Sequence, residues 1–81
     1  MTLRELRNVC RNDTQCDVTA IAYERETGKY FSFRTVVCGT SIRDDDAFPS
    51  DILDEEVIGI CTWEDSESGK PILAIDIREF V

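Results

Sequence analysis

The amino-acid sequence predicts one α+β domain spanning residues 1–81, in which an N-terminal helix packs on a four-stranded, mainly antiparallel sheet made of two hairpins. Three observations predict this fold. Apolar residues near the start recur at helical spacing, four later segments are rich in β-forming residues, and these segments form two pairs, each joined by a turn that contains Gly-Lys. With 81 residues, 42% of them hydrophobic, the chain has the composition of a single small domain with its own core.

The helix is expected over the first ten to twelve residues. Thr2 and Glu5 have the spacing of a capping box, in which each side chain accepts a hydrogen bond from the other residue's backbone N–H. The apolar face of this helix holds three residues: Leu3, Leu6 and Cys10. A neighbouring stripe holds three arginines at helical spacing: Arg4, Arg7 and Arg11.

Four strands are expected at 17–24, 30–38, 57–63 and 72–78. Gly28 and Gly69 lie in the two hairpin turns, where glycine adopts positive φ without strain. The segment from Gly39 to Pro49 is expected to interrupt the sheet, and Ser50 to cap a short helical turn near 50–55.

Alternation along the strands predicts which side chains are buried. In the second strand it places four residues on one face: Phe31, Phe33, Thr35 and Val37. The expected core consists of Leu3, Leu6, Ile21, Phe31, Phe33, Val37, Ile58, Ile60, Leu73, Ile75 and Ile77. Tyr23, Tyr30 and Trp63 are expected together on the other sheet face or at one sheet end, where a second subunit could cover them, so a homodimer or higher homo-oligomer is a candidate assembly.

Negative charge is concentrated in one segment, 44–67, which contains ten acids and no base, whereas the whole chain has a net charge of −8. These acids are Asp44, Asp45, Asp46, Asp51, Asp54, Glu55, Glu56, Glu64, Asp65 and Glu67. Such a surface suits a basic groove on a partner protein, where carboxylates can imitate a phosphate backbone. The alternative is an acidic surface that serves only solubility.

The arginine stripe suggests a second kind of site. Together with Arg34, the arginines Arg4, Arg7 and Arg11 could bind an anionic nucleotide, particularly where the helices of an oligomer meet. The alternative is a solvated helix face whose arginines pair with nearby acids.

Composition argues against several other classes. The chain has no histidine, so the common catalytic base is missing, and we expect a binding protein rather than an enzyme. Neither a C-x-x-C pair nor an EF-hand spacing is present, so no metal and no cofactor are expected. The four cysteines, Cys10, Cys16, Cys38 and Cys61, are expected as free and mostly buried thiols of a cytoplasmic protein. The acidic charge disfavours direct binding to nucleic acid or to a membrane.

Two stretches resemble a known group of proteins. The opening Met1-Thr2-Leu3-Arg4-Glu5-Leu6 resembles the MT-x-x-EL start of small phage and prophage proteins from Gram-positive gut bacteria. The stretch 48–58, FPSDILDEEVI, is similar to the P-x-x-L-L-D-x-E-V-x-S-I run that those proteins carry between their hairpins. This chain departs from them by its four cysteines and its longer middle segment. The resemblance implies a phage accessory protein that inhibits a host defence system in the cytoplasm of the bacterium.

Overall fold

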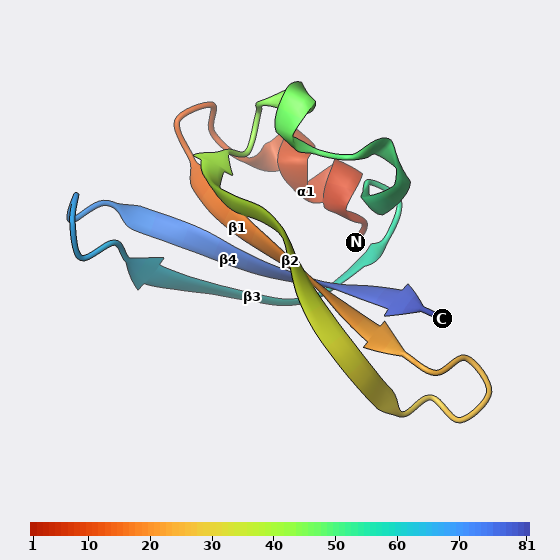
Figure 1. The fold of residues 1–81 in the computed structure, drawn as a ribbon. Coiled ribbons are helices and arrows are strands. Elements are labelled where there is room, and N and C mark those ends of the chain that lie inside the picture. The colour runs from red at the N-terminus through yellow and green to blue at the C-terminus, as the bar shows by residue number, and fades with distance from the viewer.

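The chain forms one α-helix, four strands and two short 3-10 turns, as the computed structural model of residues 1–81 shows (Figure 1). In chain order these are α1 (Leu3–Val9), β1 (Gln15–Tyr23), β2 (Tyr30–Ser41), η1 (Asp45–Ala47), η2 (Ser50–Ile52), β3 (Glu56–Glu64) and β4 (Pro71–Phe80). The predicted α+β class, with one helix and two hairpins, is confirmed. The strands are longer than the sequence predicted, and η1 was not predicted.

The sheet has the order β2-β1-β4-β3, so each hairpin supplies one edge strand and one central strand. Within the hairpins the strands are antiparallel, but β1 and β4 run parallel, from Gln15↔Ile72 to Tyr23↔Phe80. Two hairpins can place parallel strands side by side only if a crossover connection joins them. Residues 42–55, between β2 and β3, form this crossover. The two hairpin turns therefore lie at opposite ends of an elongated molecule (Figure 1), whose principal extents are 41 × 25 × 19 Å.

The helix and the crossover form one layer on one face of the sheet, and the other face has no covering element (Figure 1). The predicted capping box is present: the Glu5 backbone N–H donates to Thr2 Oγ1 over 3.2 Å, and the Thr2 N–H donates to Glu5 Oε1 over 2.9 Å. Backbone hydrogen bonds join α1 to the crossover: the Leu3 N–H donates to the Glu55 carbonyl, and the Arg4 N–H donates to the Leu53 carbonyl. These contacts fix the crossover segment beside α1.

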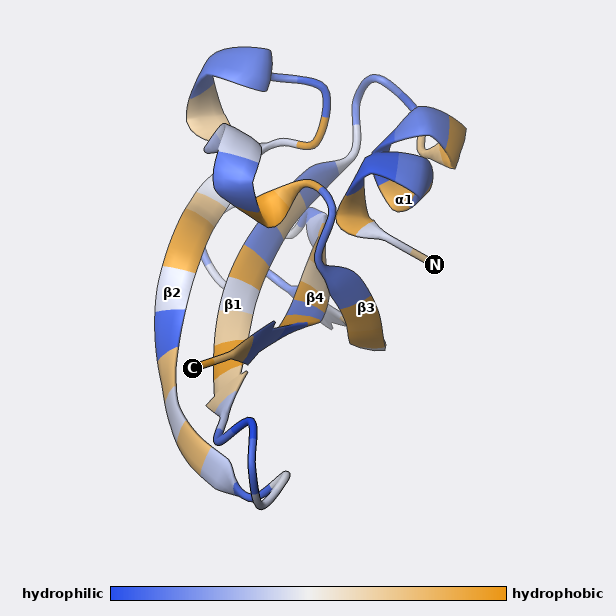
Figure 2. Ribbon diagram, turned by 90° about the vertical axis from the view of Figure 1, so that its right-hand side faces the viewer, coloured by the Kyte–Doolittle hydropathy of each residue, from blue (hydrophilic) through white to orange (hydrophobic).

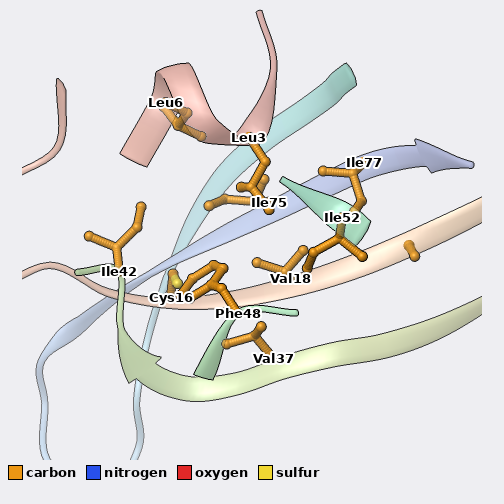
Figure 3. Close-up of a cluster of buried hydrophobic side chains, with 11 residues drawn as sticks. Leu3, Leu6, Cys16, Val18, Val37, Ile42, Phe48, Ile52, Ile75 and Ile77 are labelled. Carbon is orange, nitrogen blue, oxygen red and sulfur yellow. The ribbon is translucent and has the colours of Figure 1, made fainter. Parts of the chain in front are cut away.

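The core lies between this layer and the sheet (Figure 3). It consists of Leu3, Leu6, Cys16, Val18, Ala20, Val37, Ile42, Phe48, Ile52, Ile75 and Ile77. Six expected core residues are less buried than predicted: Ile21 and Leu73 are half-buried, and Phe31, Phe33, Ile58 and Ile60 are exposed. In their place the crossover contributes Ile42 and Phe48, from the segment predicted to interrupt the sheet, and Ile52, from the predicted helical turn near 50–55.

Bulges in β2 explain the main error in the predicted core. Val18 pairs with Val37 and Thr19 pairs with Thr35, so one extra residue, Val36, lies between the two pairs. A one-residue insertion reverses the alternation, which puts Val37 on the covered face and Thr35 and Phe33 on the open face. Further shifts occur near Phe31 and near Gly39, whose φ is +59°. Because Gly39 accommodates a bulge, β2 continues through it to Ser41 instead of ending at the predicted break.

Candidate functional site

The ten acids of the segment 44–67 divide into two groups. Seven lie in the crossover and the start of β3, beside α1, where Figure 2 shows predominantly hydrophilic colours. The other three, Glu64, Asp65 and Glu67, lie at the end of β3 and in the β3–β4 turn, at one tip of the molecule (Figure 1). The acidic segment thus forms two surfaces separated by the length of β3.

Three of these acids are neutralised by arginines of the chain. Asp45 accepts from Arg7 over 2.6 Å and Asp54 accepts from Arg4 over 3.0 Å, while Glu56 pairs with Arg78. Two others cap backbone turns. Asp44 accepts from the Asp46 N–H over 3.1 Å. Asp65 accepts from Ser68 Oγ over 2.8 Å and from the Glu67 N–H over 3.3 Å, and these hydrogen bonds lower the pKa of Asp65.

The remaining five acids have neither an ion pair nor a side-chain hydrogen bond: Asp46, Asp51, Glu55, Glu64 and Glu67. We call these the uncompensated acids. Glu55 is half-buried and the other four are exposed. Carboxylates without an internal cation are the ones available to a basic partner.

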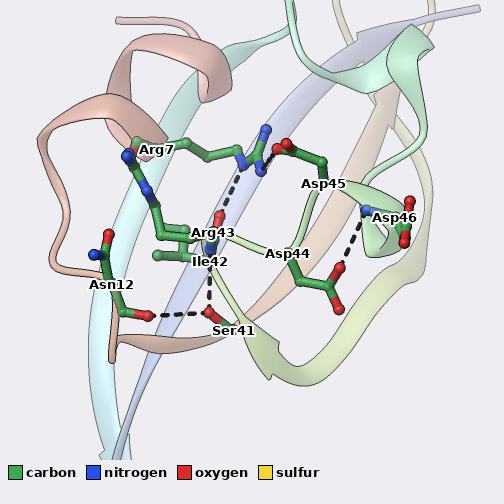
Figure 4. A network of polar contacts seen from close by, with 8 residues as sticks. All are labelled: Arg7, Asn12, Ser41, Ile42, Arg43, Asp44, Asp45 and Asp46. Carbon is green, nitrogen blue, oxygen red and sulfur yellow. Dashed lines mark hydrogen bonds and ion pairs between the residues drawn. The ribbon is translucent and has the colours of Figure 1, made fainter.

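Arg7 connects the helix to the acidic crossover (Figure 4). Its Nε donates to the Ile42 carbonyl over 2.8 Å, and its guanidinium lies 4.3 Å from the centre of the Phe48 ring. Arg43 also links the two segments, because its Nη1 donates a hydrogen bond to the Arg7 carbonyl over 2.8 Å. Arg7 is only 9% exposed, so its place in an exposed stripe was wrongly predicted. The sequence spacing already indicated this burial, because Arg7 follows Leu3 by four residues and therefore lies on the apolar side of α1.

The other candidate arginines also have carboxylate partners within the chain. Arg4 pairs with Asp54, and Arg11 pairs with Asp13 over 3.3 Å. Arg34 donates to Glu79 over 2.8 Å, and this hydrogen bond raises the pKa of Arg34. Each of the four proposed ligand-binding arginines is thus already neutralised by an acid of this chain.

Two hollows lie near the end of the sheet at which β4 begins. The first, of about 540 Å³, has nine lining residues: Arg11, Asp13, Thr14, Gln15, Thr62, Lys70, Pro71, Ile72 and Leu73. The second, of about 400 Å³, has five: Thr62, Trp63, Glu64, Gly69 and Pro71. The fold thus brings Arg11 of the α1–β1 loop and Lys70 of the β3–β4 turn to one hollow, a juxtaposition that requires the parallel β1–β4 pair.

The four cysteines are free, as expected, but they are not mostly buried. Only Cys16 is fully buried, and burial raises the pKa of its thiol to about 11. Cys10 is half-buried, and burial also raises the pKa of its thiol. Cys38 and Cys61 are exposed, because both lie on edge strands.

The aromatic residues Tyr23, Tyr30 and Trp63 share one face of the sheet, as expected, but not one end of it. Tyr23 and Tyr30 are cross-strand partners at one end of the sheet. Trp63 pairs with Ile72 at the other end, and Ile72 is also the β4 partner of Gln15. Trp63 is separated from the two tyrosines along the sheet, since the parallel pairing of β1 with β4 points the two hairpins in opposite directions.

No protein-family model matches the sequence, and no curated protein or solved structure matches it either. The resemblance to phage accessory proteins therefore stays a prediction. Nowhere do three or more carboxylates or thiols converge in a group that could hold a metal ion. Neither α1 nor the short helical turns have the length and apolar character of a membrane-spanning helix.

Proposed function

We propose that this chain is a non-enzymatic binding protein that docks its acidic surface onto a partner protein with a basic surface. One observation carries the proposal: five acids of the segment 44–67 form no ion pair within the chain, whereas each of the four candidate arginines is already paired. Charges that face outward without a partner accelerate association with an oppositely charged surface and select against others.

The resemblance to phage accessory proteins supports a more specific form of this proposal. In that form the chain is a phage-encoded inhibitor that acts in the cytoplasm of the host bacterium. Its partner is a nucleic-acid-binding defence protein, because a groove built to bind phosphates also binds carboxylates at similar spacing. The net charge of −8 supports a basic protein, and not nucleic acid itself, as the binding partner.

The proposal is tested by capture from a lysate of a Gram-positive host with three matched baits. The first is the wild-type chain, the second carries Asp or Glu to Asn or Gln at all five uncompensated acids, and the third carries Glu24→Gln and Glu26→Gln in the β1–β2 turn. We expect a basic protein on the first and third baits and its loss from the second. The same protein on all three baits would refute the acidic surface as the docking site.

A second candidate function is favoured by the hollow that Arg11 and Lys70 share. In it the chain sequesters an anionic nucleotide, and an oligomer would be needed to enclose a ligand of that size. The pairing of Arg11 with Asp13 weakens this candidate, since a ligand phosphate would have to displace that carboxylate.

Calorimetry with a cyclic dinucleotide and with ADP-ribose separates the two candidates. A heat of ligand binding that is lost in the Arg11→Ala variant and retained in the Arg34→Ala variant would support the nucleotide site. The absence of heat with both compounds at millimolar concentration would leave the acidic surface as the only candidate.

A further inference from the structure

The outer edge of β3 is covered along only part of its length. β3 is an edge strand, with β4 as its only strand neighbour. At its start, Thr2 forms a bridge with Glu56, and the Val57 N–H donates to the Met1 carbonyl over 2.8 Å. From residue 58 to residue 64 no segment of the chain pairs with this edge. The backbone groups that point outward there are available for pairing.

The two edges of the sheet differ in how far they resist pairing. β2 contains three register shifts, which interrupt its outer edge. β3 contains one shift, at Ile58, and is regular from Gly59↔Asp76 to Glu64↔Pro71. Residues 57–63 include neither a charge nor a proline. Bulges, charges and prolines are the usual protections of an edge strand, so the regular part of β3 is an unprotected edge.

Apolar side chains are exposed on both faces of this edge. Ile60, which pairs with buried Ile75, lies on the covered face of the sheet but is 51% exposed. Trp63 and Cys61 lie on the opposite face, and Trp63 is 46% exposed. An extended segment added beside β3 would cover side chains on both faces, which is how added strands obtain specificity.

One end of the edge has the chemistry of a cation site. The 400 Å³ hollow there includes Trp63 and Glu64 among its five lining residues. Glu64 Oε1 comes within 3.7 Å of the position that a Cβ on Gly69 would occupy, so the carboxylate lies against this glycine. Glu64 and Glu67 are both uncompensated. An indole ring beside carboxylates binds a lysine or arginine side chain through cation–π and ion-pair contacts.

A second copy of this chain does not fit the edge as well. A second copy carries the same net charge of −8 and the same ten acids without a base between Asp44 and Glu67. Pairing the two β3 edges would therefore bring two acidic segments together, and their like charges repel. The charge pattern therefore favours a strand that brings its own base.

We propose that β3, from Ile58 to Glu64, accepts an extended segment of a partner protein as a fifth strand. The segment has uncharged β-forming residues beside Gly59–Thr62 and a lysine or arginine that enters the hollow of Trp63 and Glu64. This inference rests on the proposed function, since it specifies how a basic partner would be bound.

The test is an NMR titration of the isotope-labelled chain with two synthetic peptides, acetyl-KTVTVTVK-amide and acetyl-ETVTVTVE-amide. They have the same β-propensity and differ only in the sign of their end charges. At low salt we expect the lysine peptide to shift the backbone amides of 58–64 and the Trp63 indole N–H, with an affinity at least tenfold higher than that of the glutamate peptide. Equal affinities, or no binding of either peptide at millimolar concentration, would overturn the proposal.

Matched variants locate the contact. Ile60→Lys on β3 should abolish the shifts, whereas Phe33→Lys on β2, at a side chain that is 66% exposed, should leave them unchanged. Glu64→Gln with Glu67→Gln should weaken binding at least fivefold, and Glu24→Gln with Glu26→Gln should not.

Two outcomes separate this inference from the proposed function. Shifts confined to 44–55 would overturn strand addition but leave the acidic docking surface in place. A concentration-dependent dimer of the chain alone that Ile60→Lys dissociates would identify a second copy as the occupant and overturn the proposal.

Discussion

The guanidinium of Arg7 donates to the Asp45 carboxylate over 2.6 Å and thereby joins α1 to the acidic crossover. The two partners differ in exposure, since the Arg7 side chain is 11% exposed and that of Asp45 is 90% exposed. The arginine is therefore held by its buried contacts with the Ile42 carbonyl and the Phe48 ring, and Asp45 completes its neutralisation from the surface.

Replacing Arg7 should destabilise the fold far more than replacing Asp45. Arg7→Ala leaves the Ile42 carbonyl without its donor and removes the contact with Phe48, so we expect the free energy of unfolding to fall by about 2–3 kcal/mol. Asp45→Asn removes only an exposed charge and should cost less than about 1 kcal/mol. Urea denaturation of both variants measures these values, and equal losses would contradict the account of Arg7.

Gly39 offers a test of the bulge that extends β2. Its φ is +59° and nothing lies within 4 Å of a Cβ built on it, so an alanine there would suffer only backbone strain. Gly39→Ala should lower the free energy of unfolding by about 1–2 kcal/mol. Gly39→Asn should cost less, because asparagine tolerates the left-handed conformation. If Ala and Asn were equally tolerated without loss of stability, β2 would not form this bulge.

The buried thiol of Cys16 should make stability depend on alkaline pH. Burial raises its pKa from 9.0 to about 11, so the folded state holds this proton more tightly than the unfolded state does. The contribution is complete below pH 9 and is lost as the pH rises through 11, with a slope of up to about 1.4 kcal/mol per pH unit between these values. Denaturation from pH 8 to pH 11 should show a shallower decline for Cys16→Ala than for the wild type. Parallel curves would contradict the predicted shift.

Thiol accessibility should follow the positions of the cysteines. Cys38 and Cys61 are exposed and should react rapidly with a thiol reagent in the native state at pH 8. Cys16 should react only on unfolding, at a rate that urea increases. The double variant Cys38→Ser, Cys61→Ser should lose the rapid phase, and a persistent rapid phase would show that Cys10 or Cys16 is accessible.

The sequence was sufficient to predict the α-helix with its capping box and the presence of four strands, because these depend on local spacing and composition. It was not sufficient to predict the core. Val36 inserts one residue into β2, and no local pattern distinguishes this bulge from a regular strand that would bury Phe31 and Phe33. The parallel pairing of β1 with β4 is a long-range choice as well, and it separates Trp63 from Tyr23. The acids could be identified from sequence, but which of them are uncompensated depends on the positions of Arg4, Arg7 and Arg78 in the fold.

The salt dependence of binding to the captured partner shows whether the five uncompensated acids form the docking site. The dissociation constant would be measured between 50 and 500 mM salt for the wild type and for the variant that lacks the five uncompensated acids. We expect the wild-type affinity to fall steeply with salt, and the variant to bind at least tenfold more weakly at low salt with little further change as salt rises. A variant with wild-type affinity and the same salt dependence would contradict the claim that these acids dock the partner.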